Sequence, residues 1–352
     1  MNTKIVKLDP LKPEEKYIQE AAEVLSGGGL VIIPTETVYG IAADMLNKKA
    51  VERLCEIKQR PKDKPFSVHI NEQMRVEEFV RAMPVSAYKL IDKFWPGPLT
   101  VILKAKNQGS IGIRMPDNEI ALKVIELARV PVVCPSANIS GRPAPVNFEE
   151  AIKDLEGLVD FAIDAGATKL GVESTVVDLT VEPLQILREG AIKKEDIEAV
   201  AQKKIILFVC TGNSCRSVMA KLLLEKKLRD KNRQDVEVLS VGIIRFGGVG
   251  ATEETRALLK EEGIDASGHR SQKVTKELIK KSDIILVMER PHEDHILQLA
   301  PEAKNKVFLL KEFAKIKDSN LDISDPIGKS KEFYAQTFEL IKEAVERISN
   351  II

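Results

Sequence analysis

Short apolar runs and amphipathic stretches alternate through the first 200 residues. The apolar runs predict β-strands at 30–33, 99–103, 111–114, 130–133, 172–179 and 184–187. Stretches with apolar residues on one helical face predict helices near 13–25, 48–58, 85–93 and 118–128. Because strands and helices are mixed without regular βαβ spacing, we expect an α+β arrangement or a mixed twisted sheet rather than a doubly wound one.

The remaining sequence alternates more regularly. Strands are predicted at 205–210, 236–242, 283–288 and 306–310, and helices at 216–230, 251–262, 273–280, 291–299 and 330–350. This order predicts a four-stranded parallel α/β sheet. Residues 190–204 between the halves are charged, helix-permissive and free of active-site motifs. We therefore predict two domains, 1–202 and 203–352.

Composition and charge exclude several classes of protein. Hydrophobic residues make up 44% of the chain, and 53 basic residues balance 53 acidic ones. A mainly disordered chain is excluded, and bulk electrostatic capture of nucleic acid is not indicated, although a local basic groove can still form. The apolar runs fall far short of the roughly 20 residues of a membrane helix, and the N-terminus lacks an apolar signal region. We expect a cytoplasmic location, no membrane association and reduced cysteines.

A polar loop follows the first strand of the second domain. Its sequence is Val209-Cys210-Thr211-Gly212-Asn213-Ser214-Cys215-Arg216-Ser217. Backbone N–H groups of such a loop at a helix N-terminus can form a nest for phosphate, and the same field favours the nucleophilic thiolate of Cys210. Arg216 can bind two phosphoryl oxygens, and Ser217 can donate to the sulfur. Asp325, kept out of helical geometry by Pro326, can supply a proton to the leaving group.

These features resemble the low-molecular-weight protein phosphatases over essentially all of 203–352. The resemblance is carried by C-x-x-x-x-x-R-S after the first strand and by D-P late in the chain. It implies that Cys210 is the nucleophile, Arg216 the phosphate binder and Asp325 the general acid. Asn213 and Ser217 would shape the loop. The implied activity is hydrolysis of a phosphorylated protein through a phosphocysteine.

Departures from the family pattern leave the phosphatase substrate open between phosphotyrosine and phosphoarginine. Ile327 follows D-P where many tyrosine-specific members carry aromatic residues, and Ser214 stands where arginine phosphatases have threonine. An arsenate reductase is disfavoured because no cysteine follows Cys215. Cys215 is equally a reversible disulfide partner of Cys210 or a packing residue. Three histidines match no metal-ligand spacing and are interpreted as surface or packing residues: His269, His292 and His295.

Seven motifs in the first half carry polar residues, several of them at the end of a predicted strand or helix. They are P-T-E-T-V-Y-G from Pro34, K-x-R-P from Lys58 with Lys64-Pro65 after it, F-W-P-G-P-L-T from Phe94, I-R-M-P from Ile113, P-S-A-N-x-S-G from Pro135, E-S-T-V-V-D from Glu173 and L-R-E-G from Leu187. Taken alone, the cationic segment 58–64 is more typical of a solvated helix end. The segment 135–143 offers hydroxyls, an amide and a glycine turn that suit a small polar ligand.

Together the motifs resemble the YrdC/TsaC family, the threonylcarbamoyl-AMP synthases, over about 1–200. The resemblance implies a mixed twisted-sheet α/β domain that makes threonylcarbamoyl-AMP and pyrophosphate from L-threonine, bicarbonate and ATP. The carbamate of threonine would attack the α-phosphorus, so catalysis requires positioning and charge neutralisation rather than a covalent nucleophile. Mg²⁺ is expected with ATP, bound largely through the phosphates, and no tightly bound cofactor or protein metal site is expected.

The same resemblance assigns the ligand-binding residues by motif position. Phosphate and carbamate charge is assigned to Lys58, Arg60 and Lys64. Threonine is assigned to Thr37, His69 and Ser174, with its carboxylate on Arg114. Nucleotide or threonine contacts are assigned to Ser136, Asn138 and Ser140, and ATP to Arg188. Without the motif, His69 is more typical of a packed strand histidine, and Trp95 is expected to pack rather than stack on a base.

We expect a natural fusion in which both domains are active. The synthase product would pass to a separate transferase that modifies the tRNA adenosine beside the anticodon. In a rival interpretation, the first domain is a nucleotide-binding or double-stranded RNA-binding module without synthase activity, and the phosphatase is the only enzyme. The intact pairs Lys58-x-Arg60 and Ser136-x-Asn138 favour the synthase.

Overall fold

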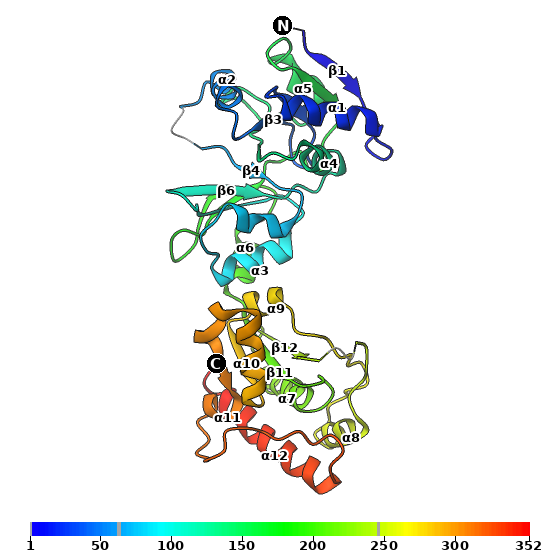
Figure 1. Ribbon diagram of the computed structural model, residues 1–352, viewed down its shortest axis with the longest axis vertical. Coiled ribbons are helices and arrows are strands. Elements are labelled where there is room, and N and C mark those ends of the chain that lie inside the picture. The colour runs from blue at the N-terminus through cyan, green and yellow to red at the C-terminus, as the bar shows by residue number, and fades with distance from the viewer. Residues whose placement is uncertain (1, 62–64, 245–246) are drawn as a thin grey trace. The chain divides into compact units, whose positions relative to one another are not determined.

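The computed structural model describes residues 2–61, 65–244 and 247–352. The chain divides into two compact units, Met1–Ala201 (unit 1) and Gln202–Ile352 (unit 2), shown from blue to red along the chain in Figure 1. The division lies one residue from the boundary predicted from the sequence. Over the described ranges, no helix has the length and apolar character that a membrane crossing demands.

Unit 1 is built on a ten-stranded sheet with the order β1-β8-β2-β3-β7-β4-β6-β5-β9-β10. The strands are β1 (Lys4–Lys7), β2 (Val31–Ile33), β3 (Gly40–Asp44), β4 (Val68–His69), β5 (Leu99–Lys104), β6 (Ser110–Arg114), β7 (Val132–Val133), β8 (Phe161–Asp164), β9 (Thr175–Asp178) and β10 (Gln185–Arg188). The helices are α1 (Glu15–Ser26), α2 (Lys48–Lys58), α3 (Val85–Phe94), α4 (Glu119–Ala128), α5 (Phe148–Lys153), α6 (Lys194–Gln202) and the 3₁₀ helix η1 (Gln73–Glu78). Parallel and antiparallel pairs both occur, which confirms the predicted mixed sheet.

Successive residues of β2 face two different apolar cores. Ile32 packs in a core with residues of α2, α3 and α5. Val31 and Ile33 pack in a second core with α1 and α4, which lie beside each other in Figure 1. Side chains alternate between the faces of a strand, so both faces of the sheet are covered here. This explains why β2 is an uninterrupted apolar run rather than an alternating one.

Unit 2 has a four-stranded sheet with the order β12-β11-β13-β14, and every neighbouring pair is parallel, as predicted. Its strands are β11 (Lys204–Cys210), β12 (Val236–Gly242), β13 (Ile284–Val287) and β14 (Val307–Leu309). Its helices are α7 (Arg216–Asp230), α8 (Glu253–Glu261), α9 (Lys276–Lys281), α10 (Arg290–Leu299), α11 (Leu310–Phe313), α12 (Lys331–Ile348) and the 3₁₀ helix η2 (Pro301–Lys306). Phe208 packs with α7 and α12, whereas Leu207 and Val209 pack with α9 and α10.

Some helix starts are fixed by polar caps visible in the sequence. The side chains of Asn118, Thr275 and Ser330 each accept a backbone N–H from the first turn of α4, α9 and α12. The strands β1, β3, β4 and β8 were not predicted. β3 reads Gly-Ile-Ala-Ala-Asp, whose residue types have low strand propensity, and β4 is only two residues long. The strand predicted at 172–179 is shorter, because 172–174 precede β9 as a loop.

Candidate active sites

A cavity of about 580 Å³ in unit 1 collects residues from most of the seven motifs. The predicted ligand-binding residues that line it are Lys58, Arg60, His69, Arg114, Ser136, Asn138, Ser140, Ser174 and Arg188. Lys64 lies outside the described residues. Thr37 does not line the cavity: it is fully buried, and its Oγ1 lies 2.9 Å from Oγ1 of Thr35, which does line it. Of the two threonines in the P-T-E-T motif, the one that lines the cavity is therefore Thr35.

Lys58 is a buried cation at the end of α2. Its side chain is only 3% exposed, and Nζ donates to the carbonyl of Ser136 at 2.6 Å and to Oδ1 of Asn138 at 2.9 Å. The next residue, Gln59, adopts left-handed geometry with φ of 48°, which ends the helix at the cavity wall. Burial, followed by the charge of Arg60, lowers the pKa of Lys58 to about 8. The solvated helix end considered from the sequence alone is therefore wrong for Lys58.

A buried ion pair supports the floor of the cavity. Arg114, at the end of β6, donates from Nη2 to Oε1 of Glu36 at 2.6 Å, and both side chains are at most 5% exposed. Oε2 of Glu36 has no partner among the described residues. Arg114 also donates from Nε to the carbonyl of Gly97 at 3.3 Å. The guanidinium proposed for the threonine carboxylate thus already neutralises one carboxylate of the protein.

His69 lies on the cavity wall as a neutral imidazole. Burial, and next the charge of Arg114, lower the pKa of His69 to about 3. Its Nδ1 is buried without a hydrogen-bond partner in the described parts of the chain. An unpartnered nitrogen on a residue that lines a polar cavity is suited to a ligand hydrogen bond.

Another part of the cavity lining joins the E-S-T and L-R-E-G motifs. Arg188 donates from Nε to the carbonyl of Ser174 at 3.0 Å and from Nη2 to its Oγ at 3.1 Å, and it pairs with Glu173. The Ser174 hydroxyl lies 2.9 Å from Oγ1 of Thr100. Cys134 also lines the cavity, but burial raises its pKa to about 12, which keeps the thiol protonated and unreactive. The cavity offers cations, hydroxyls and amides for binding.

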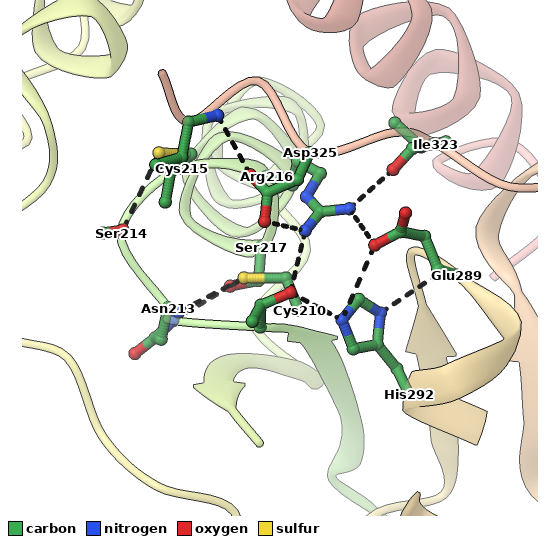
Figure 2. Close-up of polar contacts among 12 residues, drawn as sticks. Cys210, Asn213, Ser214, Cys215, Arg216, Ser217, Glu289, His292, Ile323 and Asp325 are labelled. Carbon is green, nitrogen blue, oxygen red and sulfur yellow. Dashed lines mark hydrogen bonds and ion pairs between the residues drawn. The ribbon is translucent and has the colours of Figure 1, made fainter. Parts of the chain in front are cut away.

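The site in unit 2 has a different design, centred on a thiol (Figure 2). Cys210 is the last residue of β11, the strand that pairs with both β12 and β13. Its Sγ lies 2.9 Å from Oγ of Ser217 and accepts the backbone N–H of Asn213 at 3.3 Å. The thiol is 2% exposed and lies between the loop and the first turn of α7. The Ser217 hydroxyl and the Asn213 N–H are thus the polar groups that contact the sulfur.

Asn213 fixes the shape of the loop. It has a left-handed φ of 54°, a conformation that asparagine tolerates better than most residues. Its Nδ2 donates to Oγ of Ser217 and of Ser240, both at 3.0 Å, and its Oδ1 accepts the backbone N–H of Gln272 at 2.9 Å. The side chain therefore ties the loop to β12 and to the segment before α9.

Arg216 connects the loop to two distant carboxylates. It is 1% exposed, and its Nη1 donates to Glu289 and to the carbonyl of Ile323, the latter at 2.7 Å. Its Nη2 donates to Asp325 and, at 3.0 Å, to Oγ1 of Thr211. The structure thus brings Asp325 next to the phosphate loop, as the sequence predicted. Glu289 was not predicted, although its position directly after β13, at the carboxyl edge of the sheet, is the available signal.

His292 and His269, interpreted from the sequence as surface or packing residues, both lie beside the phosphate loop. His292 is 2% exposed, and its Nε2 lies 3.0 Å from Oγ1 of Thr211. His269 places Nε2 2.7 Å from the carbonyl of Asn213. Both therefore contact the phosphate loop, which no local pattern in the sequence shows. The third histidine, His295, is half-buried, and its Nε2 lacks a partner among the described residues.

Cys215 packs among hydroxyl groups. Its Sγ lies 3.5 Å from Oγ1 of Thr252, 3.6 Å from the Tyr334 hydroxyl and 3.7 Å from Oγ of Ser214. In Figure 2 its sulfur points away from that of Cys210, and both thiols are free. This geometry favours the packing role for Cys215.

Fold and sites together define a chain of two α/β units, one with a cationic ligand cavity and one with a cysteine in a phosphate-binding loop. Family models match both units: residues 23–190 match the Sua5/YciO/YrdC family described as telomere recombination, and 205–351 match low molecular weight phosphotyrosine protein phosphatase. The chain belongs to the threonylcarbamoyl-AMP synthase family through unit 1 and to the low-molecular-weight phosphatase family through unit 2.

Individual relatives agree with this assignment. A threonylcarbamoyl-AMP synthase of Pyrococcus abyssi is 37% identical over 270 residues, covering 68% of this chain and 79% of the relative. A protein-arginine-phosphatase of Geobacillus stearothermophilus is 41% identical over 144 residues, covering 41% of this chain and 93% of the relative. The crystal structure of P. abyssi Sua5 complexed with L-threonine is 26% identical and covers 98% of each chain with a TM-score of 0.55.

Proposed function

We propose that unit 1 synthesises threonylcarbamoyl-AMP from L-threonine, bicarbonate and ATP. The observation that carries this proposal is the cavity, which gathers Lys58, Arg60, Arg114 and Arg188 around a space large enough for a nucleotide. The relative named as this synthase and the solved structure with L-threonine support the substrates. The amine of threonine takes up carbon dioxide or bicarbonate, and the resulting carbamate attacks the α-phosphorus of ATP, with pyrophosphate as the leaving group.

In this proposal the cavity acts by binding and charge neutralisation. Lys58, Arg60 and Arg188 bind the phosphates and the carbamate. Neutral His69 can hydrogen-bond threonine without adding a charge beside Arg114. Because lysine and arginine suit phosphate rather than a cation, Mg²⁺ would arrive with ATP and be bound through its phosphates.

Further partners follow from the product. Threonylcarbamoyl-AMP is an activated acyl donor, so a separate transferase would pass the threonylcarbamoyl group to tRNA. RNA binding by unit 1 without synthesis is the rival function. The buried position of Lys58 favours the synthase, because a desolvated lysine inside a cavity contacts a small ligand more readily than an RNA backbone.

The test is pyrophosphate release from ATP by the full chain, with threonine and bicarbonate each left out in turn. Release should require both, and Lys58→Ala and Arg60→Ala should each reduce it by about 100-fold, the scale of a lost charge-assisted contact in the transition state. Cys210→Ser is the matched control, because it alters only the other unit. Release that never exceeds background, with RNA binding that survives both variants, would establish the rival function.

We propose that unit 2 hydrolyses phosphoproteins through a phosphocysteine. Cys210 attacks phosphorus, Arg216 binds the equatorial oxygens, and Asp325 protonates the leaving group. Water then cleaves the sulfur–phosphorus bond and regenerates the Cys210 thiolate, while the Ser217 hydroxyl stabilises the sulfur as it leaves. This proposal rests on the 2.9 Å contact between Sγ of Cys210 and Oγ of Ser217. It also rests on Arg216, whose guanidinium binds both Asp325 and Thr211 of the loop.

Phosphoarginine is the substrate that we propose for unit 2. The 41% identical relative is named for it, and exposed Ile327 follows Asp325-Pro326 where an aromatic residue would be expected to contact a phenyl ring. Phosphoarginine and phosphotyrosine peptides of the same sequence, compared by kcat/KM, provide the test. A phosphoarginine preference of at least about tenfold supports the proposal, and equal or reversed values contradict it.

A further inference from the structure

The Thr211 hydroxyl receives two hydrogen bonds from fixed donors. Arg216 donates from Nη2 to Oγ1 at 3.0 Å, and Nε2 of His292 lies 3.0 Å from the same oxygen. Arg216 is 1% exposed and His292 is 2% exposed, whereas Thr211 is partly exposed. Two buried side chains therefore hold the hydroxyl of a residue that is itself partly exposed.

The direction of the histidine bond follows from its other nitrogen. Nδ1 of His292 is 3.1 Å from the backbone N–H of Glu289, which can only donate, so Nδ1 is the acceptor and Nε2 carries the hydrogen. Burial, and next the charge of Arg216, lower the pKa of His292 to about 4, which keeps this tautomer neutral at ordinary pH. Nε2 consequently donates to Thr211.

A hydroxyl oxygen that accepts two hydrogen bonds has used both lone pairs, and only its own hydrogen is left to donate. Among the described residues, none accepts that hydrogen. Thr211 directly follows the nucleophile Cys210, and it shares Nη2 of Arg216 with the carboxylate of Asp325. The remaining hydrogen is thus available where the phosphoryl group of a substrate would sit.

We propose that Thr211 is a further phosphoryl-binding residue, whose hydroxyl donates to a phosphoryl oxygen, and that His292 is the positioning residue that turns the hydroxyl toward it. The inference rests on the phosphatase function proposed for unit 2. The Thr211 hydroxyl would give the phosphoryl group one charge-assisted hydrogen bond in addition to those from the loop backbone and Arg216. The carboxylate of Glu289 accepts a hydrogen bond from Arg216, and the backbone N–H of Glu289 donates to Nδ1 of His292. Glu289 therefore contacts both residues that donate to Thr211.

Thr211→Val and Thr211→Ser provide the first test, because valine keeps the shape of threonine but removes the hydroxyl, whereas serine keeps the hydroxyl. Loss of a hydrogen bond to a charged group should lower kcat/KM by about 10–100-fold in the valine variant and weaken inhibition by orthovanadate and inorganic phosphate by about the same factor. The serine variant should stay within about threefold of the parent. Thr337→Val, a buried threonine of α12, is the control for loss of a hydroxyl elsewhere. A valine variant within about twofold of the parent overturns the proposal.

His292→Gln and His292→Asn test the positioning role. Glutamine can place an N–H donor near the position of Nε2, whereas asparagine can replace only the acceptor at Nδ1. The asparagine variant should lose activity and vanadate affinity, and the glutamine variant should recover part of both. In the Thr211→Val background, His292→Asn should have no further effect, because the two residues act through one hydroxyl. If His292→Asn lowers activity by the same factor in the parent chain and in the Thr211→Val variant, the positioning role is contradicted.

Failure of the phosphatase function gives a different result. If neither phosphopeptide nor para-nitrophenyl phosphate is hydrolysed faster by the parent than by Cys210→Ser, the proposed function is wrong. Binding of inorganic phosphate, measured by calorimetry on the parent and Thr211→Val, then still tests the hydroxyl contact. Equal phosphate affinity of the two chains would refute the contact itself.

Discussion

The two sites of this chain show two ways of handling phosphorus. Unit 1 surrounds a cavity with cations and hydroxyls, and the one thiol on its wall, Cys134, is kept protonated by burial. Unit 2 instead places one thiol of its loop, Cys210, within hydrogen-bond distance of the Ser217 hydroxyl and the backbone N–H of Asn213. A cysteine buried in apolar surroundings stays protonated, whereas covalent catalysis requires a sulfur that polar groups contact. The environment of the residue, and not its type, decides between positioning and covalent catalysis.

Replacement of the nucleophile should have the largest effect, and it should change the activity of only one unit. Cys210→Ser should lower phosphatase activity by at least about 10⁴-fold, because serine at neutral pH is a far weaker nucleophile than a thiolate. Pyrophosphate release by unit 1 should stay within experimental error. Cys215→Ser is the matched control: it should keep most of the activity if Cys215 only packs. A large loss in the control, together with a disulfide to Cys210 after mild oxidation, would instead show a redox pair.

Breaking the ion pair of unit 1 should have the next largest effect. Glu36→Ala leaves Arg114 buried without its counter-charge, and the unfolding free energy of unit 1 should fall by about 3–5 kcal/mol. Glu36→Gln, which keeps an acceptor for the guanidinium, should cost less. The single tryptophan, Trp95, is buried in unit 1, with Nε1 donating to the carbonyl of Leu99 at 2.7 Å. Its fluorescence during urea unfolding therefore reports on this unit, and equal midpoints for parent and Glu36→Ala would contradict the prediction.

Acid should destabilise unit 1 through His69. The pKa of His69 is lowered to about 3 in the fold and lies near 6.5 in the unfolded chain. Between these values only the unfolded chain binds the proton, so the unfolding free energy falls as pH decreases, by up to about 1.4 kcal/mol per pH unit. Trp95 fluorescence in urea at several pH values between 6 and 4 measures this slope. His69→Gln should flatten it, and a slope shared by parent and variant would exclude His69 as the cause.

The smallest expected effect is an alkaline limb in synthase activity. The pKa of Lys58 is lowered to about 8, so the cation is lost as pH rises through that value. Pyrophosphate release should then fall about tenfold for each further pH unit. Lys58→Arg keeps its charge and should move the limb to higher pH, even if its absolute rate is lower. An unchanged limb in Lys58→Arg would assign the titration to another group.

The order of elements in unit 2 could be predicted because its strands and helices carry local signals. Val236–Gly242 and Arg216–Asp230 match their predicted bounds, since an apolar strand run and a stretch of helix-forming residues are encoded over a few consecutive residues. In unit 1 the short strands β3 and β4 escaped detection, because their residues become strands only through pairing with neighbours such as β2 and β7. Prediction was weakest where tertiary pairing overrides local propensity.

The sequence by itself determined which chemistry each unit carries. The loop from Cys210 to Ser217, the Asp-Pro dipeptide and the cationic Lys58–Arg60 segment are local, and their residue types limit the reactions that they can support. Only the tertiary structure decided which partners meet. Arg114 and Glu36 are 78 residues apart, Arg216 and Asp325 are 109 apart, and His292 reaches Thr211 across 81 residues. Such contacts depend on strand order and register, which no local pattern of side chains specifies.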